Sequence, residues 1–116
     1  MQTDLARLGT ASDLLLLHHP CATEADTAKA YRALEKALSA NLTRSIGVSN
    51  LNASQLAGLL SASSVVPAVN QAALHVGLHD DVTINFCRER GITYQAYSPL
   101  GGYATASNSH AMSTGL

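Results

Sequence analysis

The sequence predicts an α/β fold in which about four parallel strands alternate with three helices. Short apolar runs of strand length are separated by longer segments with helical periodicity. The strand starts recur roughly every 25 to 30 residues, a spacing typical of β/α units whose helices cross over to the next parallel strand. This pattern suits either an open doubly wound sheet or part of a β/α barrel.

The first β/α unit begins with residues 13–18, a continuous apolar run expected of a strand buried on both faces. Residues 23–39 follow as a helix, in which Thr23 and Asp26 form a capping-box pattern. The apolar face of this helix consists of residues at helical spacing: Tyr31, Leu34 and Leu38.

The second and third units follow the same plan. Residues 45–48 form a strand, and the next helix opens at Asn52, whose side chain pairs with Gln55 three places on. A short third strand, residues 68–71, comes directly after Pro67. These signals predict two further parallel strands joined by one crossover helix.

The last unit contains a helix and the fourth strand. Asp80 or Asp81 caps a helix that runs through Phe86 and stops at Gly91, where a left-handed residue costs least. Residues 92–97 then form the fourth strand.

The composition narrows the possible functions. The chain has 116 residues, 13% of them charged, with a net charge of -1 and no basic stripe, so nucleic acid and anionic membrane are poor partners. No apolar run reaches signal or transmembrane length, and a cytoplasmic location is therefore expected. The two cysteines are far apart in sequence and predict neither a disulfide framework nor a zinc site.

Polar side chains stand at the end of every predicted strand. They are His18, Ser49, Asn50, Gln71, Tyr97 and Ser98. Because parallel strands place their carboxyl ends side by side, four polar ends in succession predict a shared polar site on one rim of the sheet. The alternative is that loops simply begin with polar residues.

Two other patterns are rejected as sites. His75 and His79 are four apart and would share a helix face, but no HExxH glutamate or third ligand accompanies them, so no metal site is predicted. Residues 47–51, GVSNL, begin like the GxSxG nucleophile elbow but lack its last glycine, which argues against a hydrolase.

Four motifs follow one another along the chain: DLLLLHHP, RSIGVSNLN, PAVNQ and GITYQAYSPLGG. In this order they resemble motifs of the aldo-keto reductase family. The resemblance implies a partial (β/α)8 TIM barrel covering about the fourth to seventh β/α units, and NADPH-dependent reduction of aldehydes or ketones to alcohols. Residues 1–102 would form this partial barrel domain, and residues 103–116, which show no period, a flexible loop after the last strand.

The resemblance also implies roles for the polar strand ends in holding the nicotinamide. A carboxamide offers one acceptor oxygen and two donor hydrogens, which the hydroxyl and amide groups of Ser49, Asn50 and Gln71 can complement. Tyr97 would stack on the nicotinamide ring. Hydride transfer needs such a platform because the ring must be held in a fixed position against the carbonyl carbon.

Four further residues receive roles by resemblance. His18 would lie beside the carbonyl oxygen and donate or orient a hydrogen bond as negative charge develops there. Ser98 and Leu100 would flank the cofactor's pyrophosphate. His19 stands where the family often has a large aromatic residue lining the substrate pocket.

The sequence also departs from the family pattern. Of the family's Asp, Tyr, Lys and His tetrad, only the histidine has a counterpart, because the other three come from strands earlier in the barrel. Tyr31 and Lys29 lie on a crossover helix and cannot substitute for them. We therefore expect this chain alone to be inactive, and to be marginally stable, self-associating or dependent on a partner fragment because one sheet face and both edges would meet water.

Two other functions stay open. Some members of the superfamily are non-catalytic, cofactor-sensing accessory subunits of channels, and they keep the same cofactor-binding strand ends. An unrelated doubly wound domain, in which the polar strand ends are accidental, is the third hypothesis.

Overall fold

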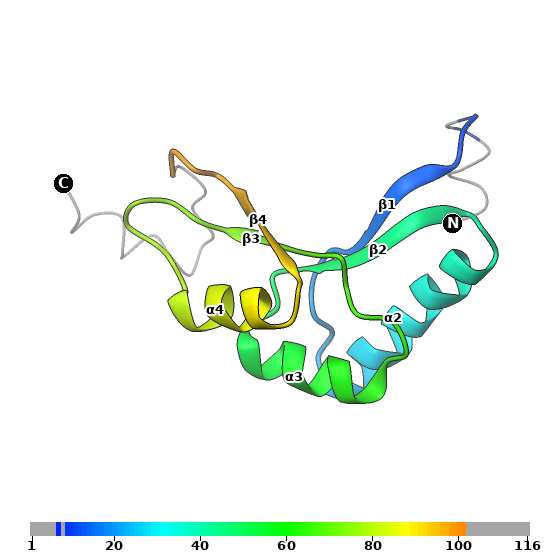
Figure 1. Cartoon of the computed structure of the whole chain (residues 1–116), viewed down its shortest axis with the longest axis horizontal. Coiled ribbons are helices and arrows are strands. Elements are labelled where there is room, and N and C mark those ends of the chain that lie inside the picture. The colour runs from blue at the N-terminus through cyan, green and yellow to red at the C-terminus, as the bar shows by residue number, and fades with distance from the viewer. Residues whose placement is uncertain (1–6, 8, 102–116) are drawn as a thin grey trace.

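The computed structural model describes Arg7 and residues 9–101, which form one parallel sheet with helices on one of its faces (Figure 1). The strands are β1 (Ser12–Leu17), β2 (Thr43–Ser49), β3 (Val69–Ala73) and β4 (Thr93–Tyr97). The helices between them are α2 (Glu24–Ser39), α3 (Ala53–Ala62) and α4 (Asp81–Glu89). The predicted α/β class, with four parallel strands alternating with three helices, is confirmed.

The strands lie in chain order, β1-β2-β3-β4, and every neighbouring pair is parallel. Pairing of β2 with β3 is confined to the carboxyl end of β2, where Val48 faces Asn70 and Ser49 faces Gln71. Gln71 in turn faces Gln95 of β4. Residues from three strands therefore meet at one level of the sheet.

Side-chain caps explain where the first two helices begin. The Thr23 hydroxyl accepts a hydrogen bond from the backbone N–H of Asp26, at 3.1 Å. At the start of α3, the Asn52 side chain accepts from the Gln55 N–H and the Gln55 side chain accepts from the Asn52 N–H, both at 2.9 Å. Both caps satisfy backbone donors that have no partner within the helix, as the sequence predicts.

Asp80, rather than Asp81, caps α4. Its carboxylate accepts hydrogen bonds from the Thr83 N–H at 3.1 Å and from the Thr83 hydroxyl at 2.6 Å, and these bonds hold the pKa of Asp80 below its usual value. The same hydroxyl accepts from the N–H of Ala53 at 2.9 Å, which ties the start of α3 to the start of α4. Gly91, with φ +70°, ends the helix as predicted.

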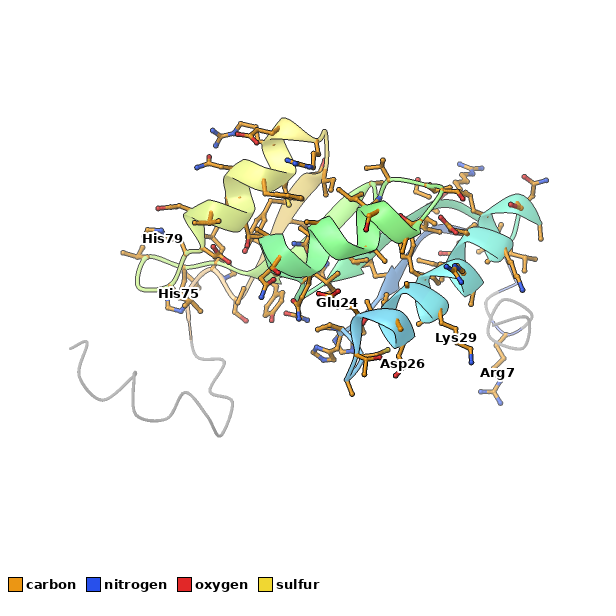
Figure 2. All side chains as sticks on the ribbon, turned by 90° about the horizontal axis from the view of Figure 1, so that it is seen from below. Arg7, Glu24, Asp26, Lys29, His75 and His79 are labelled. Atoms are coloured by element: carbon orange, nitrogen blue, oxygen red, sulfur yellow. The ribbon has the colours of Figure 1, made fainter. Side chains whose placement is uncertain are left out.

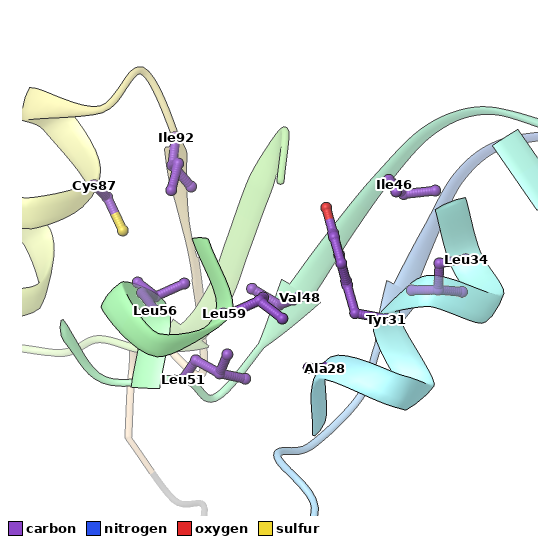
Figure 3. Close-up of a cluster of buried hydrophobic side chains, with 10 residues drawn as sticks. All are labelled: Ala28, Tyr31, Leu34, Ile46, Val48, Leu51, Leu56, Leu59, Cys87 and Ile92. Carbon is purple, nitrogen blue, oxygen red and sulfur yellow. The ribbon is translucent and has the colours of Figure 1, made fainter. Parts of the chain in front are cut away.

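The hydrophobic core lies between the sheet and the three helices (Figure 3). Its buried members are Ala28, Tyr31, Leu34, Ile46, Val48, Leu51, Leu56, Leu59, Cys87 and Ile92. Tyr31 is 0% exposed, and its hydroxyl donates to the carbonyl of Val65 at 3.1 Å. Burial raises the pKa of Tyr31, so this phenol is held protonated on the helix side of the sheet.

The opposite face of the sheet is covered by no helix in the described part of the chain (Figure 1). Because strand side chains alternate, this face carries Leu14 and Leu16 of β1, Gly47 of β2 and Val69 of β3. A Cβ atom added at Gly47 would lie 2.7 Å from the carbonyl oxygen of Val69 and 2.8 Å from Cδ2 of Leu16. Gly47 therefore lets β1, β2 and β3 approach closely on this face.

Some details differ from the sequence predictions. Strand β3 continues two residues past Gln71, so Gln71 lies in its middle. His75 and His79 lie in the loop before α4 rather than on a helix face (Figure 2). In this loop His75 and Leu78 form an isolated antiparallel bridge. Residues 103–116, predicted to be a flexible loop, lie outside the described residues.

The described residues contain no group of three His, Cys, Asp or Glu residues that could hold a metal ion. None of the helices in this part of the chain has the length and apolar character needed to cross a membrane.

Candidate functional site

A cavity of about 180 Å³ lies at the carboxyl ends of the strands. Its lining consists of predicted site residues: His18, His19, Ser49, Asn50, Gln71 and Tyr97. The cavity is smaller than the roughly 300 to 1,000 Å³ of sites for drug-sized ligands, and suits one flat ring rather than a whole dinucleotide.

A larger hollow of about 630 Å³ lies at the other end of the sheet. Residues of the last turns of α2 and residues just before β3, such as Lys36 and Val65, line it. In parallel α/β folds the ligand sites gather at the carboxyl ends of the strands, so we do not assign the site to this larger hollow.

Ser49 is 1% exposed and binds the backbone of the neighbouring strand. Its hydroxyl donates to the carbonyl of Gln71 at 2.6 Å, and the N–H of Asn50 donates to the same carbonyl at 2.9 Å. The Ser49 hydroxyl proton is therefore already used within the protein. Its oxygen remains an acceptor.

Asn50 connects three strands through one amide. Its Nδ2 lies 2.9 Å from the carbonyl oxygen of His18, 3.1 Å from Nδ1 of His19 and 3.1 Å from the hydroxyl oxygen of Ser49. Its Oδ1 accepts from the Tyr97 hydroxyl at 2.6 Å. Asn50 adopts φ +63°, a left-handed conformation that asparagine tolerates better than most side chains, so its amide points back over the strand ends.

Gln71 binds a residue that the sequence analysis did not predict to belong to the site. Its Nε2 donates to Oε1 of Gln95 at 2.8 Å. Gln95 lies two residues before Tyr97 on β4 and therefore on the same face, a signal that strand alternation contains. The amide pair leaves Oε1 of Gln71 without a hydrogen-bond partner among the described residues.

His18 and His19 follow β1 directly, and both are exposed. Their ring centroids are 4.0 Å apart, with the planes tilted by 37°. Both rings line the cavity, so two imidazoles stand on the same side as the Asn50 amide.

Ser98 and Leu100 do not line this cavity. Ser98, with φ +51°, turns the chain after β4, and its carbonyl accepts from the N–H of Gly101 at 2.9 Å. Leu100 is 99% exposed. Any contact of these two residues with a ligand would therefore lie outside the cavity, beyond Tyr97.

The chemistry available in the cavity is that of hydrogen bonding and stacking. The side chains that line it are two imidazoles, two amides, one hydroxyl and one phenol, with no lysine or carboxylate among them. Such a set can orient an uncharged polar ring and donate to an oxygen. Tyr31 and Lys29 of α2 do not reach it, because Tyr31 is buried in the core and Lys29 is an exposed residue of the same helix.

The sequence comparisons identify one family. The sequence model of the aldo/keto reductase family matches residues 1–114. An aldo-keto reductase of Mycolicibacterium vanbaalenii is 38% identical over 109 residues, which cover 93% of this chain and 39% of that protein. A morphine 6-dehydrogenase of Pseudomonas putida is 42% identical over 99 residues, covering 84% and 33%.

Solved structures agree with the sequence comparisons. An aldo/keto reductase from Brucella melitensis superposes with a TM-score of 0.81 at 35% identity, over 87% of this chain and 40% of the other. A Bombyx mori aldo-keto reductase in complex with NADP gives 0.79 at 33% identity, over 93% and 38%. The fold is thus part of a (β/α)8 TIM barrel, and the chain spans two fifths or less of the proteins it matches.

Proposed function

Because this chain belongs to the aldo/keto reductase family, we propose that it supplies the nicotinamide end of an NADPH site used to reduce aldehydes or ketones to alcohols. The observation that supports this most is the cavity at the strand ends, lined by amide, hydroxyl, imidazole and phenol groups. Two of the similar solved structures are described as complexes with NADP or NADPH.

The residues fit a nicotinamide by type. Gln71 offers Oε1 to a carboxamide N–H, and the Ser49 oxygen can accept a second hydrogen bond. Tyr97 would form the stacking platform, with its ring held by the bond from its hydroxyl to Asn50. Ser98 and Leu100 follow Tyr97 and would flank the pyrophosphate outside the cavity.

The bound NADPH would supply the hydride. The residues of this chain that would contact the substrate are His18 and His19. His18 would donate to the carbonyl oxygen as it gains negative charge. His19 would contact the rest of the substrate. The lining holds no lysine or carboxylate to tune a proton donor. We therefore expect the 116-residue chain alone to bind NADPH more readily than it reduces a carbonyl substrate.

A chimaeric barrel tests this proposal. In it, residues 9–101 replace the matching segment of the Mycolicibacterium vanbaalenii aldo-keto reductase, a relative 38% identical to this chain. We expect NADPH to bind to it, and Tyr97→Ala to weaken binding about 10-fold or more, since stacking on an aromatic ring is worth roughly 1 to 3 kcal/mol per base. Calorimetric titration measures both affinities.

Two further variants separate stacking from hydrogen bonding. Tyr97→Phe keeps the ring and removes the hydroxyl that donates to Asn50, so most of the affinity should remain. Tyr94→Phe is the matched control, because Tyr94 packs against the helix side of the sheet and its hydroxyl donates to Ala73 at 3.3 Å. Equal NADPH affinity of the Tyr97→Ala variant and the unaltered chimaeric barrel would contradict the proposal. NADPH binding without turnover of a generic aldehyde would favour the non-catalytic alternative.

Self-association of the isolated chain is a second part of the proposal. Leu14, Leu16 and Val69 are only half-buried on the uncovered sheet face, and among the described residues β1 and β4 are each paired on one side only. Open edges and apolar faces favour association. Light scattering on the eluting 116-residue chain should give a mass above 12.1 kDa. A monomer with one sharp unfolding transition would contradict this expectation.

The cytoplasmic location expected from the sequence stays a prediction.

A further inference from the structure

The pairing of the strands defines how far the sheet climbs from its first edge to its last. Leu16 of β1 pairs with Gly47 of β2. Gly47 lies beside Val69 of β3, because the residues that follow these two form a pair. Val69 in turn pairs with Thr93, the first residue of β4. Thr93 is therefore level with Leu16, so the sheet climbs by four residues from the start of β1 at Ser12 to the start of β4.

This climb is half of what a closed barrel of this kind needs. A TIM barrel has eight parallel strands, and its shear means that one circuit ends about eight residues further along the starting strand. Four parallel strands that climb by four residues make up half of such a circuit. A second copy that continued the sheet at the β4 edge with the same climb would end at the free edge of β1 and close the circuit.

We propose that two copies of the 116-residue chain close one eight-stranded barrel, in which β4 of each copy pairs in parallel with β1 of the other. A two-fold axis along the barrel relates the copies and keeps all strands parallel. The climb places Ser12 of the second copy opposite Thr93, and Leu16 of the second copy opposite Tyr97. The inference deepens the self-association proposed above and rests on it, but it does not depend on the reaction.

The side chains agree with this register. Ser12 and Leu16 lie on the uncovered face of β1, because Leu15 and Leu17 between and after them pack against the core. Thr93 and Tyr97 lie on the same face of β4, because Tyr94 packs against the core. Residues that are paired on neighbouring parallel strands must point to the same side of the sheet, and both proposed pairs do so.

Other dimers leave part of this surface unsatisfied. Stacking two uncovered faces against each other would bury the polar groups of Gln71, Gln95 and Tyr97, which lie on that face. Antiparallel pairing of two β1 edges or two β4 edges would leave the other edges unpaired and Leu14 and Leu16 in water (Figure 1). The closed barrel pairs both edges, covers the apolar side chains and keeps the amides at its open rim.

The surface that the barrel covers is large enough for a dimer. A face four strands wide and five residues long measures roughly 300 Å², at about 4.8 Å per strand and 3.3 Å per residue. Two strand edges of this length add roughly the same area again, since sheets pack about 10 Å apart. Two copies together therefore cover about 1,200 Å², which reaches the lower end of stable protein interfaces.

Closure also brings a residue of the second copy to the candidate site. Tyr97 lines the cavity at the carboxyl ends of the strands, and β4 is an edge strand of the described sheet. In the closed barrel Leu16 of the second copy lies on the neighbouring strand, about 4.8 Å away between backbones. The second copy thus covers the side of the Tyr97 ring that faces the free edge of β4.

Light scattering on the eluting 116-residue chain tests the stoichiometry. We expect twice 12.1 kDa, about 24 kDa. Leu16→Lys places an ammonium group in the covered surface and should return the mass to 12.1 kDa at the same concentration. Val76→Lys is the matched control, because Val76 is 98% exposed in the loop before α4, and it should leave the mass at that of the dimer.

Disulfide trapping tests the register and does not depend on the Leu16 variant. The exposed Cys21 is replaced by serine and the buried Cys87 is kept. Ser12→Cys and Thr93→Cys are then made as two separate chains. Mixing and oxidising them should give covalent heterodimers, because opposite residues lie within the roughly 4.4 to 6.8 Å between Cα atoms that a disulfide spans. Each chain alone should give none, because the two-fold axis places identical residues on opposite sides of the barrel.

A mixture of Ser12→Cys with Gln95→Cys is the off-register control. Gln95 lies on the same face two residues beyond Thr93, so its Cα should be more than about 7 Å from that of Ser12 and the yield at least about 10-fold lower. Equal yields from the two mixtures, cross-linking of a single variant, or a mass other than that of the dimer would overturn the closed barrel. A dimer that the Ser12→Cys and Thr93→Cys mixture fails to trap would overturn it too, but self-association would stand. Failure of NADPH to bind the chimaeric barrel would instead overturn the proposed function and leave these results unaffected.

Discussion

Replacing Gly47 with alanine is expected to lower the free energy of unfolding by about 2 to 3 kcal/mol, a large share of the stability of an ordinary domain. The added Cβ would lie 2.7 Å from the Val69 carbonyl oxygen and 3.3 Å from the Val69 nitrogen. The Leu16 side chain, 2.8 Å away, can rotate, but the Val69 backbone belongs to strand β3 and cannot move without shifting the sheet. Urea titration followed by circular dichroism measures the change.

Gly77→Ala is the matched control for this experiment. Gly77 lies in the exposed loop before α4, and a Cβ there would meet only the His75 ring at 3.4 Å, which is an ordinary contact. This variant should unfold within about 0.5 kcal/mol of the unaltered chain. If Gly47→Ala were equally harmless, the close approach of β2 and β3 would not be a constraint on the fold.

Replacing His18 with alanine in the chimaeric barrel is expected to lower kcat for a generic aldehyde about 100-fold or more. Loss of a donor aimed at a developing negative oxygen costs roughly 10² to 10³ in kcat in other enzymes. NADPH affinity should stay nearly constant, because the role proposed for the His18 ring is at the substrate carbonyl, while its backbone oxygen keeps the bond to Asn50 in the variant. Stopped-flow and steady-state rates measured at 340 nm separate hydride transfer from release of the oxidised cofactor.

His79→Ala is the control for the His18 variant, since His79 lies in the loop before α4 and is not among the residues that line the cavity. Its kcat should match that of the unaltered chimaeric barrel. A His18→Ala variant with full kcat would show that the histidine after β1 takes no part in the reaction.

The sequence predicted the order and direction of the strands well because the signals involved are local. The Thr23 and Asn52 caps and the Gly91 stop depend on residues within one turn, and each is present as expected. The end of β3 could not be predicted in this way. Residues 72 and 73 pair with β4 across the sheet, and no local signal in the sequence reveals that pairing.

The residue types of the site could be predicted from the sequence, but the hydrogen bonds between its residues could not. Asn70 and Gln71 are neighbours in sequence, yet they point to opposite faces: Nδ2 of Asn70 donates to the Leu51 carbonyl at 2.9 Å on the helix side, and only Gln71 lines the cavity. Gln95 could have been found from strand alternation. The bonds from Asn50 to His19 and Tyr97 could not, because they depend on a left-handed backbone and on strands brought together by folding.

The Asn50 amide joins groups 31 and 47 positions away along the chain. Loop closure over such spans costs entropy before any contact compensates for it, so we expect this network to form late, after β4 has paired with β3. A nascent chain of which only β1, β2 and β3 have left the ribosome would therefore expose the imidazoles of His18 and His19 without the phenol of Tyr97. Ligand capture would then depend on the docking of β4, and nicotinamide binding would report the pairing of β3 with β4 as much as the identity of the site residues.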